Sequence, residues 1–266
     1  MNLLPLNHPM FAARTLRSFA RSPTFSSLSP NWEGGVSMVQ GASRGIGLEF
    51  VKHLLENNEK GHVVATCRNP GQATGLLELK NKFDERLCIL ELDVTNETTI
   101  KASAKSIEER YGSLNLLINA SGILSIPNVL LPETTLNKVE KSSLLHAYEV
   151  NAVGPILVIK HLWPFLKAGG GSGTEREVAV VANISARVGS IGDNRLGGWH
   201  SYRASKTALN QCTVDTDLSR PFQRNVPEGK LFTKEFSVQK LMTIINNAKS
   251  QDNGKFFAWD GQEIPW

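Results

Sequence analysis

A tyrosine and a lysine four positions apart are the residues of this chain whose types and spacing most directly suggest chemistry. Tyr202 and Lys206 belong to the stretch Ser-Tyr-Arg-Ala-Ser-Lys, and residues four apart in a helix project from one face. A phenol ionises near pH ~10, and a neighbouring cation lowers its pKa because the cation favours the phenolate. The pair therefore predicts an acid–base device that exchanges a proton near neutral pH.

A glycine-rich turn early in the chain predicts a phosphate-binding loop. The apolar run Val36 to Gln40 is followed by Gly41-Ala42-Ser43-Arg44-Gly45-Ile46-Gly47 and then by an apolar-periodic segment. This order predicts a strand, a tight turn and a helix, whose free N–H groups and dipole would stabilise a phosphate. The spacing G-x-x-x-G-x-G is a variant of the glycine motif of dinucleotide-binding folds.

The same residues occur in the order used by the short-chain dehydrogenase/reductase family, which the chain resembles from about residue 36 to its end. The correspondence runs through the glycine turn and through Asn119, Asn151, Ser185, Tyr202 and Lys206. Within the family, residues 214–218 and 254–259 are most similar to carbonyl reductases of the C-factor-like type. The resemblance implies a single α/β domain with a Rossmann-like, doubly wound parallel sheet.

Length and patterning agree with one such domain. The 266 residues, 41% of them hydrophobic, suffice for one buried core. Short apolar runs of strand length occur at 36–40, 62–67, 87–92, 114–119 and 178–183. Helical segments separate these runs, which predicts a parallel sheet with right-handed crossovers.

Three sequence features predict where helices begin and end. Thr95 or Asn96 is expected to cap the helix after the third strand. A longer amphipathic stretch, 142–167, contains Pro155 and Pro164, which should kink it or end it.

The resemblance also implies a cofactor site at the carboxyl ends of the strands. NAD-specific enzymes place an acidic residue after the second strand to bind the ribose hydroxyls. This chain has Arg68 there instead, and Arg68 with Arg44 offers guanidinium groups that match a 2′-phosphate. NADP(H) is therefore the expected cofactor, and no metal is expected. The implied cofactor-binding residues are Gly41, Ser43, Arg44, Gly45, Ile46, Gly47, Arg68, Asp93, Val94, Asn119, Ala120, Gly122, Tyr202 and Lys206.

Two positions of this set leave alternatives open. Asp93 either contacts the adenine or only terminates its strand. Ala120 and Ser121 depart from the family's usual Asn-Asn-Ala-Gly sequence, although Asn119 and Gly122 remain.

By the same resemblance the catalytic residues are Asn151, Ser185, Tyr202 and Lys206. Ser185 would hold the substrate carbonyl oxygen while Tyr202 donates a proton to it as hydride arrives from the nicotinamide. Lys206 would bind the nicotinamide ribose and lower the pKa of Tyr202, and Asn151 would hold a water that relays protons. The implied substrate is a small carbonyl compound: an aldehyde, a ketone or a quinone.

A segment of the family pattern is missing after Cys212. The family continues the Tyr–Lys helix, adds a sixth strand and a Pro-Gly turn, and then reaches the segment that matches 214–218. A parallel crossover normally needs on the order of a dozen residues and its strand about five or six, so neither fits here. We expect an internal deletion and a sheet without its sixth strand. The backbone groups of the neighbouring strand would then be unpaired unless the final strand, near 256–259, moves over to take its place. A non-catalytic NADP(H)-binding protein is therefore the alternative function.

The first 32 residues differ in composition from the rest. They contain Arg14, Arg17 and Arg21, many serines and no acidic residue, so they account for most of the formal net charge of +4. This composition resembles a mitochondrial or chloroplast transit peptide; a disordered leader on a cytoplasmic protein is the alternative. The remaining domain, residues 33–266, is almost neutral, which argues against nucleic acid as a partner. No apolar run is long enough for a membrane span.

Other features widen the set of expectations. The cysteines Cys67, Cys88 and Cys212 lack metal-binding spacing and are expected to be reduced, buried thiols. The family resemblance allows for a homodimer or homotetramer.

Ser43 also suggests a competing function. The turn that contains it fits G-x-S-x-G, the nucleophile elbow of serine hydrolases, with His146, His161 and His200 as candidate bases. That assignment would leave Gly47 and Arg68 unexplained.

Overall fold

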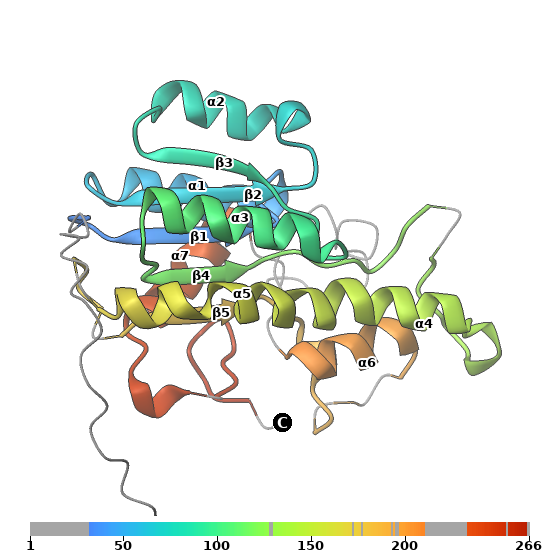
Figure 1. Cartoon of the computed structure of the whole chain (residues 1–266). Coiled ribbons are helices and arrows are strands. Elements are labelled where there is room, and N and C mark those ends of the chain that lie inside the picture. Colours follow the sequence, from blue (N-terminus) through green and yellow to red (C-terminus); the bar gives the residue numbers. More distant parts are fainter. Residues whose placement is uncertain are drawn as a thin grey trace, which may run out of the picture.

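The protein forms one parallel sheet with helices on both faces. The computed structural model describes residues 32–127, 130–171, 173–176, 178–192, 194, 197–210, 233–253 and 255–264. Its strands are β1 Val36–Gln40, β2 His62–Cys67, β3 Leu87–Glu91, β4 Leu116–Asn119 and β5 Val180–Asn183. They lie in the order β3-β2-β1-β4-β5, and each neighbouring pair is parallel (Figure 1). The predicted Rossmann-like α/β fold is confirmed.

Two groups of helices cover the two faces of the sheet. One face packs against α1 Gly45–Glu56, α2 Thr74–Lys82 and α7 Lys234–Asn246 (Figure 1). The other face packs against α3 Glu97–Arg110 and α5 Gly154–Gly169. Asn96 caps α3, as expected, by accepting a hydrogen bond from Thr98 N. The strands β1, β2 and β4 are therefore buried on both sides, which explains why they are nearly continuous apolar runs, whereas the edge strand β5 is only partly buried.

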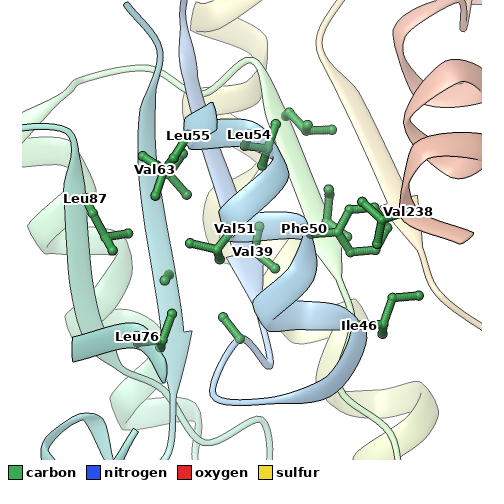
Figure 2. Packing of buried hydrophobic residues seen from close by; sticks show 14 of the residues in the cluster. Val39, Ile46, Phe50, Val51, Leu54, Leu55, Val63, Leu76, Leu87 and Val238 are labelled. Atoms are coloured by element: carbon green, nitrogen blue, oxygen red, sulfur yellow. The ribbon is translucent and has the colours of Figure 1, made fainter. Parts of the chain in front are cut away.

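The first core forms because α1 carries its apolar residues on one stripe. Ile46, Phe50 and Leu54 recur at helical spacing and are buried. Figure 2 shows Ile46 and Phe50 on the side of α1 that faces Val238 of α7. This stripe holds α1, and with it the glycine turn that precedes α1, firmly against the sheet.

The predicted long helix consists of three pieces. It begins as α4 Lys141–Tyr148, passes through a π-helical turn, Glu149–Val153, and continues as α5. Pro155 does not end the helix, because it lies in the first turn of α5, where its missing N–H is tolerated and the π-helical turn directly precedes it. Pro164 does not end the helix, because Leu162 and Leu166 on either side of it are buried in the second core and hold that turn in place.

The chain beyond β5 does not supply the expected replacement strand. No strand after β5 occurs within the described ranges, and residues 211–232, which contain the predicted deletion site, lie outside them. Of the two outcomes that the sequence left open, the final strand does not take the missing strand's place, because the segment 256–259 does not join the sheet. The chain turns back on itself instead: Phe257 bridges to Glu263, and Phe256, Ala258 and Ile264 form a small buried cluster.

The cysteines and the predicted leader lie partly outside the described residues. Cys67 and Cys88 are buried free thiols, as predicted, while Cys212 lies outside the described residues. So do residues 1–31 of the predicted leader; Trp32 packs against His62 and Tyr111 of the domain. In the part of the chain that is described, no helix is long and apolar enough to span a membrane.

Phe50→Ala should destabilise the domain by about 3–5 kcal/mol, because it removes a fully buried ring from between α1 and α7. Urea unfolding of the purified chain measures this loss. Leu77→Ala is the control, since Leu77 on α2 is 40% exposed and should lose little. Equal losses for the two variants would contradict the packing described here.

Candidate active site

Tyr202 and Lys206 lie on one short helix, α6 His200–Leu209, as their spacing predicted. Both are buried, with 7% and 2% of their surfaces exposed. The Lys206 ammonium lies 5.9 Å from the centroid of the Tyr202 ring and donates a hydrogen bond to Ile184 O at 3.0 Å. Ile184 directly follows β5, so this bond attaches α6 to the carboxyl edge of the sheet.

The electrostatics of the pair differ from the prediction. Burial raises the pKa of Tyr202 above its ordinary value, and burial lowers the pKa of Lys206 to about 7. Both shifts favour the neutral form, because removal from water penalises either charge. The expected lowering of the tyrosine pKa by the lysine is therefore wrong for this geometry: desolvation of both groups is the dominant effect.

Asn151 joins three segments at the site. It lies in the π-helical turn and is fully buried. Its carboxamide accepts from Ile123 N at 2.7 Å and donates to Ile123 O at 2.9 Å and to Ser205 Oγ at 2.9 Å. Both amide hydrogens are thus bound to protein groups, and only one acceptor lone pair remains for the predicted water.

Gly122 lets the lysine approach this junction. A Cβ at Gly122 would lie 3.2 Å from Lys206 Nζ and 3.4 Å from Asn151 Oδ1, which is tighter than ordinary contact. A side chain here would displace either the lysine or the asparagine.

Ser185 lies beside α6 but faces the helix backbone. Its hydroxyl donates to Lys206 O at 3.3 Å. The next residue, Ala186, belongs to a small buried cluster with Leu124 and Tyr202. In the described part of the chain no hydrogen bond reaches the Tyr202 hydroxyl, so the predicted carbonyl-binding role requires Ser185 to exchange its bond to Lys206 O for one to substrate.

The glycine turn has the form predicted for it. Gly41 has φ +83°, a region that disfavours other residues, and a Cβ at Gly47 would lie 2.2 Å from Gly41 O. The turn leads into α1, whose first turn carries no acidic residue and no side-chain cap from Arg44. The N–H groups at this helix end are therefore available to an anion.

The cofactor residues after the other strands divide into two kinds. Arg44 and Arg68 are exposed, and their side chains make no hydrogen bond or ion pair with described residues. Asp93 instead accepts bonds from Thr95 N and Thr95 Oγ1, at 2.9 and 2.8 Å, which supports its role as a strand terminator. Val94 is buried.

Buried polar atoms without partners mark the same edge of the sheet. Asn119 donates to Asn183 Oδ1 at 2.8 Å, but Asn119 Oδ1 has no partner. Ser121 Oγ and Thr66 Oγ1 are buried and unpaired as well. Ala120 N donates a hydrogen bond to Gln40 O, which holds the end of β4 beside the end of β1. Buried polar groups normally have partners, so these atoms, the glycine turn and the open helix end fit a polar ligand such as a dinucleotide.

The hydrolase alternative lacks its base. His161 Nε2 lies 2.6 Å from Glu97 Oε1, and His146 Nδ1 lies 3.7 Å from Glu149 Oε2. His200 begins α6, and no histidine is hydrogen-bonded to Ser43 in the described residues. Within these residues no group of three His, Cys, Asp or Glu side chains could hold a metal ion.

Two further residues at the site, Ser205 and Glu133, were not predicted. Ser205 bonds Asn151, and Glu133 is a buried carboxylate that accepts bonds from Ser201. Ser205 could have been suspected from its place between Tyr202 and Lys206. Glu133 lies in a loop without periodicity, so no local pattern indicates its burial.

The fold and the site together define a class: an α/β oxidoreductase with a Rossmann-like sheet, a glycine turn for a dinucleotide and a Tyr–Lys pair. A family model described as short chain dehydrogenase matches residues 36–219. The chain therefore belongs to the short-chain dehydrogenase family, whose members use nicotinamide dinucleotides.

Individual relatives agree with this placement. The NADPH-bound carbonyl reductase from chicken fatty liver is 31% identical, with a TM-score of 0.74 over 87% of this chain and 98% of that chain. The C-signal protein of Myxococcus xanthus is 28% identical over 171 residues, 58% of this chain and 94% of its own length. An uncharacterized oxidoreductase of Schizosaccharomyces pombe is 28% identical over 264 residues, which cover 87% of this chain and 98% of the relative.

The last alignment bears on the missing segment. The alignment is 264 positions long, but it contains only 87% of the 266 residues of this chain. Some aligned residues of the relative therefore have no counterpart in this chain. An internal deletion predicts such a difference.

Stability should depend on the pH through Lys206. The pKa of Lys206 falls from 10.5 to about 7 on folding, so the unfolded chain binds more protons between these values. Stability conferred by this group therefore rises with pH across that window and is lost as the pH falls through it. Lys206→Met should remove the effect, so the stability of the protein relative to this variant should increase between about pH 7 and about pH 10.

Urea unfolding at successive pH values measures this difference. The exposed Lys141→Met is the control, and its difference from the unmodified chain should stay flat. A flat difference for Lys206→Met would show that the lysine is not desolvated.

Proposed function

We propose that this protein reduces a carbonyl compound with NADPH. The observation that carries the proposal is the burial of Tyr202 and Lys206 on one face of α6, joined to the carboxyl edge of the sheet where the glycine turn also lies. The chicken enzyme's description as an NADPH-bound carbonyl reductase supports it. The substrate class is an aldehyde, a ketone or a quinone.

Tyr202 would act as the proton donor. Burial raises its pKa, so the phenol stays protonated at neutral pH and can give its proton to an oxygen that is becoming negative. Trp199 and Leu124 surround the ring and help exclude water. The Tyr202 hydroxyl makes no hydrogen bond with the described residues, so it would be able to donate to a substrate.

Lys206 would bind the cofactor's nicotinamide ribose and stabilise negative charge on Tyr202. Its pKa of about 7 means that a nearby anion or ribose hydroxyl can decide its charge. When bound, a reduced nicotinamide supplies the hydride that carbonyl reduction requires. Asn151 would hold the segments on either side of Lys206 in place through its bonds to Ser205 and Ile123. The remaining lone pair of its Oδ1 would accept a hydrogen bond from a relay water.

The cofactor's phosphates would lie at the glycine turn and the start of α1. Backbone N–H groups of this turn and the dipole of α1 favour negative charge. Arg44 and Arg68, exposed and without partners in the described residues, would bind a 2′-phosphate. Asn119 Oδ1 and Ser121 Oγ would gain the partners that they lack within the protein.

A second candidate is a protein that binds NADP(H) without turnover. The bond from Ser185 Oγ to Lys206 O favours it, because this hydroxyl is not directed at the tyrosine. The glycine turn, Arg44 and Arg68 would bind the cofactor in either case. Turnover distinguishes the two candidates.

Tyr202→Phe should lower turnover of reactive aldehydes or quinones by at least about a hundredfold, because general acid catalysis contributes roughly 10²–10⁴. NADPH affinity should change little, since the hydroxyl alone is removed. NADPH absorbance measures turnover, and cofactor fluorescence measures binding. Binding without turnover in the unmodified chain would support the second candidate instead.

Arg68→Ala and Arg44→Ala should each weaken NADPH binding by about ten- to a hundredfold, because each removes a charge-assisted contact to the 2′-phosphate. NADH affinity should stay nearly constant. Lys101→Ala, on the exposed side of α3, is the charge-matched control. Equal losses for NADPH and NADH would refute the assignment of the arginines.

A further inference from the structure

Glu133 is a buried carboxylate for which the proposed reaction has no use. Only 4% of its surface is exposed, although Glu140, further along the same loop, lies in solvent. A buried carboxylate is costly unless charged or polar donors surround it. Its environment should therefore show what it stabilises.

The donors to Glu133 that lie in the described part of the chain come from the start of α6. Ser201 N donates to Glu133 Oε2 at 3.3 Å, and Ser201 Oγ donates to Glu133 Oε1. Trp199 N donates to the backbone oxygen of Glu133. Three bonds thus join one loop residue to the first turn of the helix that carries Tyr202.

This helix lacks a cap of its own. The N-cap residue is Trp199, which has φ +51° and whose side chain does not cap the helix. The first N–H groups of a helix need acceptors, and a negative charge there also interacts favourably with the helix dipole. Glu133 supplies both from 68 positions earlier in the chain.

The loop that carries Glu133 is fixed to the same site at its other end. We call residues 123–127 and 130–133 the strap. Asn151 holds Ile123, Leu124 lies in the cluster of Tyr202, and Ile126 and Leu130 bond each other through both backbone groups. The strap therefore fixes the position of Glu133 relative to the junction at Asn151 and Lys206.

We propose that Glu133 is a positioning residue for Tyr202. Its buried carboxylate caps α6 and fixes the position of the helix start, and with it the position of the Tyr202 phenol. The inference rests on the proposed function of Tyr202. It deepens that function, because it makes the strap part of the machinery that aims the proton donor.

The test compares Glu133→Gln, Glu133→Ala and Ser201→Ala in the full chain, with Glu140→Gln as a control on the exposed part of the same loop. Glu133→Gln keeps an acceptor for Ser201, so it should lower kcat by about tenfold, and Glu133→Ala should lower it further. KM and the NADPH dissociation constant should stay within about twofold, because no contact to either ligand is removed. Loss of stability with kcat unchanged per folded molecule would mean a merely structural role and would overturn the proposal.

A double-variant cycle identifies the contact. If Glu133 acts through Ser201, the combined Glu133→Gln and Ser201→Ala variant should lose less than the product of the two single losses. Independent, multiplicative losses would overturn the proposed route.

Amide hydrogen exchange provides a readout that does not need turnover. In Glu133→Gln the first-turn amides of α6, Ser201 and Tyr202, should exchange at least about tenfold faster, while the amides of α1 should not change. Unchanged exchange in α6, or a uniform increase over the whole domain, would overturn the proposal even if the chain turned out to bind NADPH without reducing a substrate. Absence of turnover in the unmodified chain would instead contradict the proposed function alone.

Discussion

The carboxamide of Asn151 is the constraint on which the geometry of the site depends. It bonds both backbone groups of Ile123 and the hydroxyl of Ser205, so it joins the loop after β4, the π-helical turn and α6 at one buried point. The π-helical turn widens the helix where the asparagine must reach both partners, in keeping with the frequent occurrence of such turns at functional sites. Lys206 is also attached to the sheet through Ile184 O, but only this junction joins α6 to the strap through a side chain of the π-helical turn in the described residues.

The second constraint is burial. Tyr202 and Lys206 are removed from water, and each is shifted toward its neutral form. Charge that arises at either group during a reaction must therefore be met by substrate, cofactor or the other member of the pair. Electrostatic effects are large in such a site because little solvent screens them.

The fold was predictable from the sequence because its determinants are local or periodic. The five apolar runs, the glycine turn before α1 and the cap at Asn96 each lie within a few residues of the element that they specify. The spacing of Tyr202 and Lys206 was sufficient to predict that both lie on one helix, because this determinant is local as well. The starts of β4 and β5 were predicted two residues too early, since apolar residues precede the paired part of each strand, while the predicted ends agree with the structure.

The rest depends on contacts between distant segments. Glu133 and Ser201 are far apart in sequence, and the π-helical turn has no local pattern that would indicate it. The pKa prediction failed because the depth of burial outweighed the proximity of the two groups. The final segment does not pair with the edge of the sheet, because its apolar residues pack against one another within their own turn, Phe256 against Ile264.

The strap has an evolutionary consequence. It follows β4 and is bonded at one end to Asn151 and at the other to the helix that carries Tyr202. A substitution that reshaped the strap would therefore also shift that helix. Under the proposed function, substrate range and turnover number would not be independently adjustable traits, and sequence divergence should proceed through paired changes in the strap and α6.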